Sequence, residues 1–237
     1  MRRFDAVLFD AGETLLRPEP SFPELIVRLL EARGLQVSDH DPHWINNALA
    51  SVFRAMDDLV VNREHFSTSA ERSRTFWTEI YIRLLAELGV SDPDAAHATH
   101  LYEEFSKPEH YALFPDALPA LRDLAASGYA LGIVSNFESW LTTLLERLGI
   151  LPLMSVVVVS GDEGIEKPDP KIFRLALDRL DVSPERVTYV GDNPRIDVEP
   201  ALALGMGAVL VDRRGVHASF RASPVVRSLE QVPAVIR

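Results

Sequence analysis

Four separate segments of the sequence contain acidic, hydroxyl or ammonium side chains that could do chemistry together. These residues are Asp10, Ser135 with Asn136, Lys167, and Asp192 with Asp197. Asp10, Ser135 and Asp192 each follow closely on a short apolar run, as residues at the end of a buried strand do. In α/β proteins, ligands bind outside the carboxyl ends of the strands. We therefore expect the four segments to meet in one crevice.

This combination of groups is typical of phosphoryl transfer to a carboxylate. Asp10 as the nucleophile would be repelled by an anionic phosphoryl group, and a bound divalent cation removes that repulsion. Asp192 and Asp197 could hold Mg²⁺ together with Asp10, since oxygen ligands suit this hard ion. Lys167 would neutralise the remaining charge, and Ser135 with the amides of the following helix would bind phosphate oxygens. The predicted reaction is hydrolysis through a covalent aspartyl-phosphate.

The elements that would position these residues alternate between strands and helices after residue 110. We expect strands at 129–134, 156–159, 187–190 and 208–211, alternating with helices at 117–126, 141–148, 172–180 and 196–204. A first strand at Phe4–Phe9 precedes them. This order predicts an α/β fold, a Rossmann-like parallel sheet core flanked by helices.

The segment between the first strand and this alternating region has a different pattern. Apolar residues recur at helical spacing within 25–30, 44–56, 76–88 and 94–105, and no strand pattern interrupts them. We therefore expect an inserted all-helical cap domain at residues 17–110. Residues 1–16 and 111–237 would form the catalytic core.

The composition restricts the classes of function. The formal net charge of −11 disfavours nucleic acid as a partner, and the lack of cysteine excludes disulfides and thiolate metal sites. No apolar run approaches the ~18–20 residues that span a bilayer, and the N-terminal residues do not resemble a signal peptide. We expect a cytoplasmic protein that acts on a small phosphorylated metabolite, with neither nucleic acid nor membrane as a partner. The oligomeric state is left open.

The sequence resembles the haloacid dehalogenase superfamily, in the branch with a C1-type helical cap. FDAGETLL, IVSNF, EKPDPKIF and YVGDNPRID resemble its four motifs in this order, and the match extends from Phe4 to Val211. The resemblance implies that Asp10 is the nucleophile, that Ser135 donates a hydrogen bond to the phosphate, and that Lys167 stabilises charge. It also implies that Asp192 and the backbone carbonyl of Gly12 are metal ligands and that Asp197 is a supporting acid. Asn136, next to Ser135, is a further candidate for substrate binding.

Gly12 departs from the phosphatases of this superfamily, which resemble D-x-D-x-T. Their second Asp is a general acid and base, whereas here the carboxylate falls one position later, at Glu13. Loss of a general acid/base costs ~10²–10⁴-fold in rate. We therefore expect slow turnover, least impaired for substrates with good leaving groups. Gly12 also leaves open another class of function, a ligand- or partner-binding protein that keeps the fold and metal site but has lost efficient turnover.

Two other activities of the superfamily are disfavoured. The haloacid dehalogenases resemble D-x-Y-x-T and use no metal, in contrast to Gly12 and the acidic pair Asp192 and Asp197. The phosphonoacetaldehyde hydrolases resemble D-x-A-x-T and need a cap lysine for a Schiff base, but the expected cap has no lysine before Lys107 at its end. The sequence therefore favours a Mg²⁺-dependent phosphatase.

Overall fold

The computed structural model describes residues 3–37, 42–61 and 65–236. The chain divides into two compact units, one made of Met1–Arg17 with Leu113–Arg237 and the other of Pro18–Ala112. We call the first the core unit and the second the helical unit. None of the helices in the described ranges combines the length and apolar character that crossing a membrane requires.

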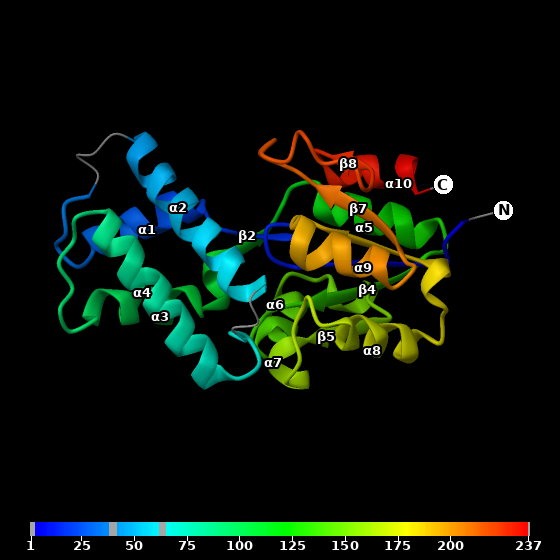
Figure 1. Ribbon diagram of the computed structural model, residues 1–237, viewed down its shortest axis with the longest axis horizontal. Coiled ribbons are helices and arrows are strands. Elements are labelled where there is room, and N and C mark those ends of the chain that lie inside the picture. The colour runs from blue at the N-terminus through cyan, green and yellow to red at the C-terminus, as the bar shows by residue number, and fades with distance from the viewer. Residues whose placement is uncertain (1–2, 38–41, 62–64, 237) are drawn as a thin grey trace. The chain divides into compact units, whose positions relative to one another are not determined.

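A six-stranded parallel sheet lies at the centre of the core unit (Figure 1). Its strands are β1 (Ala6–Phe9), β4 (Ala130–Ser135), β5 (Val156–Val159), β6 (Val187–Gly191), β7 (Gly207–Val211) and β8 (Val225–Val226). Their order is β5-β4-β1-β6-β7-β8, with every pair of neighbours parallel. Because β1 pairs with β4 on one side and β6 on the other, the carboxyl ends of these three strands meet at one edge.

Helices flank this sheet. They are α5 (Ala117–Ala126), α6 (Leu141–Arg147), α7 (Ser160–Glu163), α8 (Pro170–Leu180), α9 (Glu199–Ala203) and α10 (Val232–Val235), with 3₁₀ turns η2 (Leu151–Leu153), η3 (Pro184–Arg186) and η5 (Leu229–Gln231) and a π-helical turn η4 (Pro194–Val198). Apolar residues of α8 and α9, such as Phe173 and Ala201, pack against Leu8 and Tyr189 of the sheet. This buried layer makes the strands a rigid support for whatever lies at their ends.

The helical unit has a core of its own. It contains α1 (Phe22–Glu31), α2 (Pro42–Val61), α3 (Ala70–Glu87), α4 (Ala96–Phe105) and the 3₁₀ turn η1 (Pro108–His110). Aromatic rings join α1, α3 and α4, since Phe105 stacks on Phe22 with the ring centroids 4.7 Å apart and on Tyr81 at 5.6 Å. α1 begins after Ser21, whose hydroxyl oxygen accepts a hydrogen bond from the Glu24 amide at 3.3 Å.

The predicted α/β fold with a Rossmann-like parallel sheet is confirmed, and each strand expected for it is present. The helix expected at 196–204 is instead the turn η4 followed by the short α9. Pro200 has no N–H to donate, so a continuous α-helix through it would lack the hydrogen bond to Ile196. Three short strands were not expected, namely β8 and the two strands of a separate sheet, β2 (Leu16–Pro18) and β3 (Tyr111–Leu113).

Candidate active site

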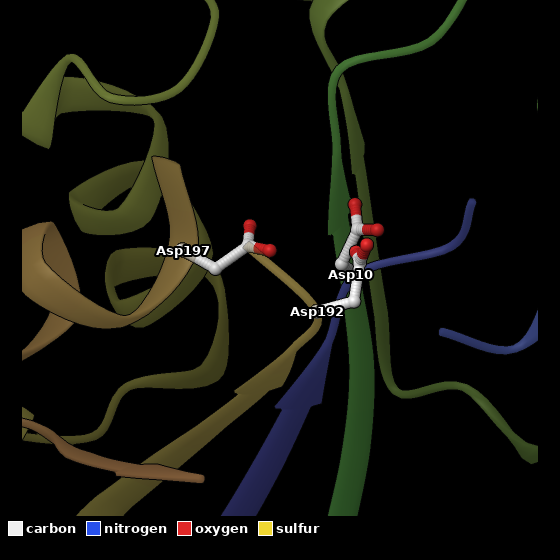
Figure 2. Close-up of side chains that lie close together, drawn as sticks. All are labelled: Asp10, Asp192 and Asp197. Carbon is white, nitrogen blue, oxygen red and sulfur yellow. The ribbon is translucent and has the colours of Figure 1, made fainter. Parts of the chain in front are cut away.

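Three aspartates meet at the carboxyl edge of the central strands. Asp10 follows β1, Asp192 follows β6, and Asp197 lies in the turn η4. One carboxylate oxygen from each lies within 4.8 Å of the others. Figure 2 shows Asp10 and Asp192 at the ends of their strands, with Asp197 facing them from the helical side. The fold thus brings together the three acids that the sequence proposes as metal ligands.

Lys167 lies between two of these acids. Its Nζ is 2.6 Å from Asp10 Oδ1, 2.6 Å from Asp197 Oδ1 and 2.9 Å from the hydroxyl oxygen of Tyr189. The lysine is only 2% exposed, although it lies outside the regular elements, before α8. An ammonium group has three N–H donors, and each has an acceptor here.

Ser135 and Asn136 end and follow β4, beside this lysine. The Ser135 hydroxyl donates a hydrogen bond to Asp10 Oδ1 at 3.1 Å. The hydroxyl expected to bind phosphate therefore contacts the expected nucleophile. The carboxamide of Asn136 bonds the main chain of Lys167 twice, accepting from its N–H at 2.6 Å and donating to its carbonyl at 2.8 Å. The contacts of Asn136, a candidate for substrate binding, therefore hold the lysine segment in place.

The loop after β6 fixes the positions of Asp192 and Asp197. Asp197 Oδ2 accepts from the Asn193 amide at 3.0 Å, and Asp192 Oδ1 accepts from the Thr14 hydroxyl at 3.3 Å. A Cβ atom at Gly191 would overlap the carboxyl group of Asp197, so only glycine fits there. Both carboxylate oxygens of Asp197 have partners in the protein, since Oδ1 accepts from Lys167 and Oδ2 accepts from the Asn193 amide.

Burial and mutual repulsion perturb the ionisation of the site. Burial, together with Asp197, Asp10 and Glu13, raises the pKa of Asp192 well above its usual range. Burial also raises the pKa of Asp10, although Lys167 opposes this effect. Burial alone would lower the pKa of Lys167, but the facing carboxylates of Asp10 and Asp197 raise it to about 12. The lysine is therefore charged at every physiological pH.

The family model for haloacid dehalogenase-like hydrolases matches residues 4–205, most of the chain. The chain belongs to this family. The resemblance seen in its four motifs is confirmed.

Two curated proteins are similar to this chain in sequence, and one solved structure is similar to it in fold. Haloacid dehalogenase-like hydrolase domain-containing protein 3 of Danio rerio is 31% identical over 233 residues, covering 96% of this chain and 94% of that protein. Phosphoserine phosphatase of Thermus thermophilus is 35% identical over 153 residues, covering 64% of this chain and 61% of that protein. The magnesium-bound structure of a hydrolase of this family from Bacillus subtilis has a TM-score of 0.78 at 21% identity, with both chains fully covered.

The acid cluster of this hydrolase fits a divalent cation. Lys167 offsets only one of the negative charges of Asp10, Asp192 and Asp197. The Thr14 hydroxyl and Lys167 stabilise the charged form of Asp192, but burial and the neighbouring acids outweigh them, so its pKa is raised. Because the donors are carboxylate oxygens, a hard cation such as Mg²⁺ suits them.

Gly12 lies in the turn between β1 and β2, at the position where the phosphatases of the superfamily have their second Asp. A Cβ atom at Gly12 would meet nothing within 4 Å. The next residue, Glu13, has a left-handed backbone with φ of 54° and lines a hollow with Asp192, Arg213 and Arg214. Burial raises the pKa of Glu13, and the nearby arginines, first Arg214, oppose it.

The sequence reasoning missed Tyr189. It lies on β6, fully buried, and contacts Lys167 through its hydroxyl group. The sequence does contain one signal for this residue, a tyrosine within the apolar run of β6. A buried tyrosine needs a hydrogen-bond partner for its hydroxyl group, so its position indicates a polar contact inside the core.

Proposed function

We propose that this hydrolase is a phosphatase of a small phosphorylated metabolite, with Asp10 as its nucleophile. The observation that carries the proposal is the pairing of Asp10 with Lys167 and Ser135, beside Asp192, at the end of β1. Lys167 favours the carboxylate form of Asp10, because its charge lowers the pKa of Asp10 against the opposing effect of burial. The relationship to a phosphoserine phosphatase also supports this class of reaction.

The proposed reaction has two steps, both at Asp10. A carboxylate oxygen attacks the phosphorus, the bond from phosphorus to the leaving oxygen breaks, and the phosphoryl group is carried by Asp10. Water then attacks this aspartyl-phosphate and releases inorganic phosphate. The Ser135 hydroxyl, which can donate, would bind a phosphoryl oxygen, and the Lys167 ammonium would offset the negative charge that develops.

Asp10, Asp192 and the backbone carbonyl of Gly12 would hold Mg²⁺ in this proposal. The ion, when bound, would reduce the repulsion between Asp10 and the phosphoryl group. Asp197 belongs to the same cluster, but its oxygens already contact Lys167 and the loop after β6. Its contribution would be to hold Lys167 in position.

The proposal extends to the division of the chain. Residues 1–16 and 111–237 would carry the chemistry. Residues 17–110 would act as a cap that selects the metabolite.

Hydrolysis of p-nitrophenyl phosphate in the presence of Mg²⁺ tests the proposal. We expect turnover above the blank in the wild type and its loss in Asp10→Asn, because the amide is not a nucleophile. Asp123→Asn, at an exposed position of α5, is the matched control and should keep wild-type turnover. Equal turnover in wild type and Asp10→Asn would refute the role of Asp10. A panel of phosphorylated metabolites, assayed by phosphate release, would then identify the substrate.

A second candidate function rests on Gly12. The position has room for a side chain but no acid, so the protein could have kept its fold and cation site for binding a ligand or partner rather than for turnover. Wild-type protein that binds Mg²⁺ but hydrolyses neither the aryl phosphate nor the panel would favour this function.

A further inference from the structure

We propose that Tyr189 is a positioning residue that fixes the ammonium group of Lys167 against Asp10. The hydroxyl oxygen of Tyr189 lies 2.9 Å from Lys167 Nζ, and both side chains are buried. Because an ammonium group can only donate, the tyrosine oxygen must be the acceptor. The expected effect on turnover rests on the proposed function, whereas the effect on the lysine itself does not.

The proton of the Tyr189 hydroxyl is used elsewhere. It is donated to the main-chain carbonyl of Val134 at 2.7 Å, while the alternative acceptor, Asp197 Oδ1, is farther away at 3.4 Å. Val134 directly precedes Ser135 in β4, and Tyr189 belongs to β6. The hydroxyl therefore links the two strands that flank β1, and its free lone pair faces the lysine.

The ring of Tyr189 is held as firmly as its hydroxyl group. It packs edge-to-face on Phe173 of α8, with the ring centroids 5.1 Å apart and an interplanar angle of 70°. Both rings are fully buried in the same apolar layer. The acceptor offered to Lys167 is therefore part of the rigid core rather than of a loop.

A third acceptor matters because lysine is a flexible cation. Its ammonium group ends a flexible four-carbon chain, and its contacts to Asp10 and Asp197 use only two of its three N–H donors. The contact with Tyr189 satisfies the last N–H and adds a third point that holds the group in place. Without it, a buried charged donor is unsatisfied or the ammonium group moves, and either change is costly.

Tyr189→Phe tests the inference, because it removes the hydroxyl and keeps the ring that packs on Phe173. The sequence contains three lysines, Lys107, Lys167 and Lys171. Selective ¹⁵N labelling of lysine therefore gives a simple ammonium NMR spectrum, in which a Lys167→Met variant identifies the Lys167 signal. In the wild type we expect that signal to show slow exchange with water, since the group is buried and fully bonded.

The variant should speed this exchange by about tenfold or more, or should shift the Lys167 signal. Unchanged exchange and an unchanged shift would overturn the inference whatever the activity of the protein. Faster exchange in a protein that has no phosphatase activity would support the positioning of Lys167 and count only against the proposed function.

Kinetics with p-nitrophenyl phosphate give a second readout. Tyr189→Phe should lower kcat by about tenfold and change KM by less than about twofold, because it misplaces a charge used in the reaction rather than removing a substrate contact. In a Lys167→Met background, Tyr189→Phe should cause no further loss of kcat, since the effects of substitutions at residues that act as a unit are not additive. A further, fully additive loss would overturn the inference. Tyr129→Phe, at the residue directly before β4 and so far from Ser135 at the end of that strand, is the matched control and should leave kcat unchanged.

Discussion

Replacing Gly12 by aspartate should give this hydrolase the acid/base group that its sequence lacks. The side chain has room, because a Cβ atom at Gly12 meets nothing within 4 Å. The backbone also accepts it, since Gly12 is not among the glycines with positive φ. Glu13 has that left-handed conformation instead, which directs its side chain differently from that of residue 12. The substitution should therefore be tolerated without rearrangement of the turn.

The size of the gain follows from two opposing effects. A general acid/base contributes ~10²–10⁴-fold to a rate. The new carboxylate, however, joins the buried Asp10 and the half-buried Asp192, whose pKa values are already raised, and this repulsion reduces the gain. We expect kcat to rise by ~10–100-fold, which corresponds to a barrier lower by about 1.4–2.7 kcal/mol.

The leaving group provides the decisive comparison. An alkyl phosphate such as glycerol 2-phosphate needs a proton on its leaving oxygen, whereas p-nitrophenolate leaves without one. The gain in kcat for Gly12→Asp should therefore be larger for the alkyl phosphate. Gly12→Asn, which has the same shape but no acid, is the control and should gain nothing. An equal gain in the Asn variant, or a lower kcat for Gly12→Asp with both substrates, would refute the reasoning.

Three further predictions concern binding and stability. Because burial and neighbouring acids raise the pKa of Asp192, protons compete with Mg²⁺ at pH values above the ordinary aspartate pKa of about 3.9, so the rise in Tm caused by Mg²⁺ should keep growing as the pH rises above that value; a rise independent of pH would contradict this. Asp116→Asn should lower the free energy of unfolding at pH 7 by about 2 kcal/mol, since its carboxylate accepts two hydrogen bonds from Arg213. Although burial opposes it, Arg213 lowers the pKa of Asp116, so this stabilisation exists above the unfolded pKa of about 3.9 and should disappear as the pH falls through the lower folded value. Urea titrations at several pH values would measure both the loss of stability at pH 7 and its dependence on pH. Gly132→Ala should cost about 1–3 kcal/mol in the same assay, because its Cβ would overlap Leu8, and an unchanged midpoint would show that the sheet relaxes there.

The positions of Asp10, Ser135 and Asp192 could be predicted from the sequence because each follows an apolar run. Parallel strands bring their carboxyl ends to one edge, so the order of strands and helices was enough to predict that these residues meet. The main part of the fold was predictable for the same reason. Strands such as β2 and β3 were not, because three residues are too few to show a periodic pattern.

The contacts that hold Lys167 could not be predicted in the same way. Its segment is fixed by the carboxamide of Asn136, which lies 31 residues away, and no periodicity records such a contact. An Asn after a strand is equally consistent with a helix cap and with a residue that binds substrate. The role of Tyr189 depends on the distance across β1 between β6 and β4, which only the folded sheet defines.

The central position of β1 has a consequence for how the chain matures. Its residues are made before those of β4 and β6, yet Ala6 pairs with Ala130 and with Val187, more than half the chain away. During synthesis β1 must therefore remain without its first partner until β4 has been translated, and without its second partner until β6 has been translated. Contacts so distant in sequence form slowly, which leaves this segment exposed to misassociation. Since Asp192 directly follows β6, the cluster of three acids can form only after this last partner has docked beside β1.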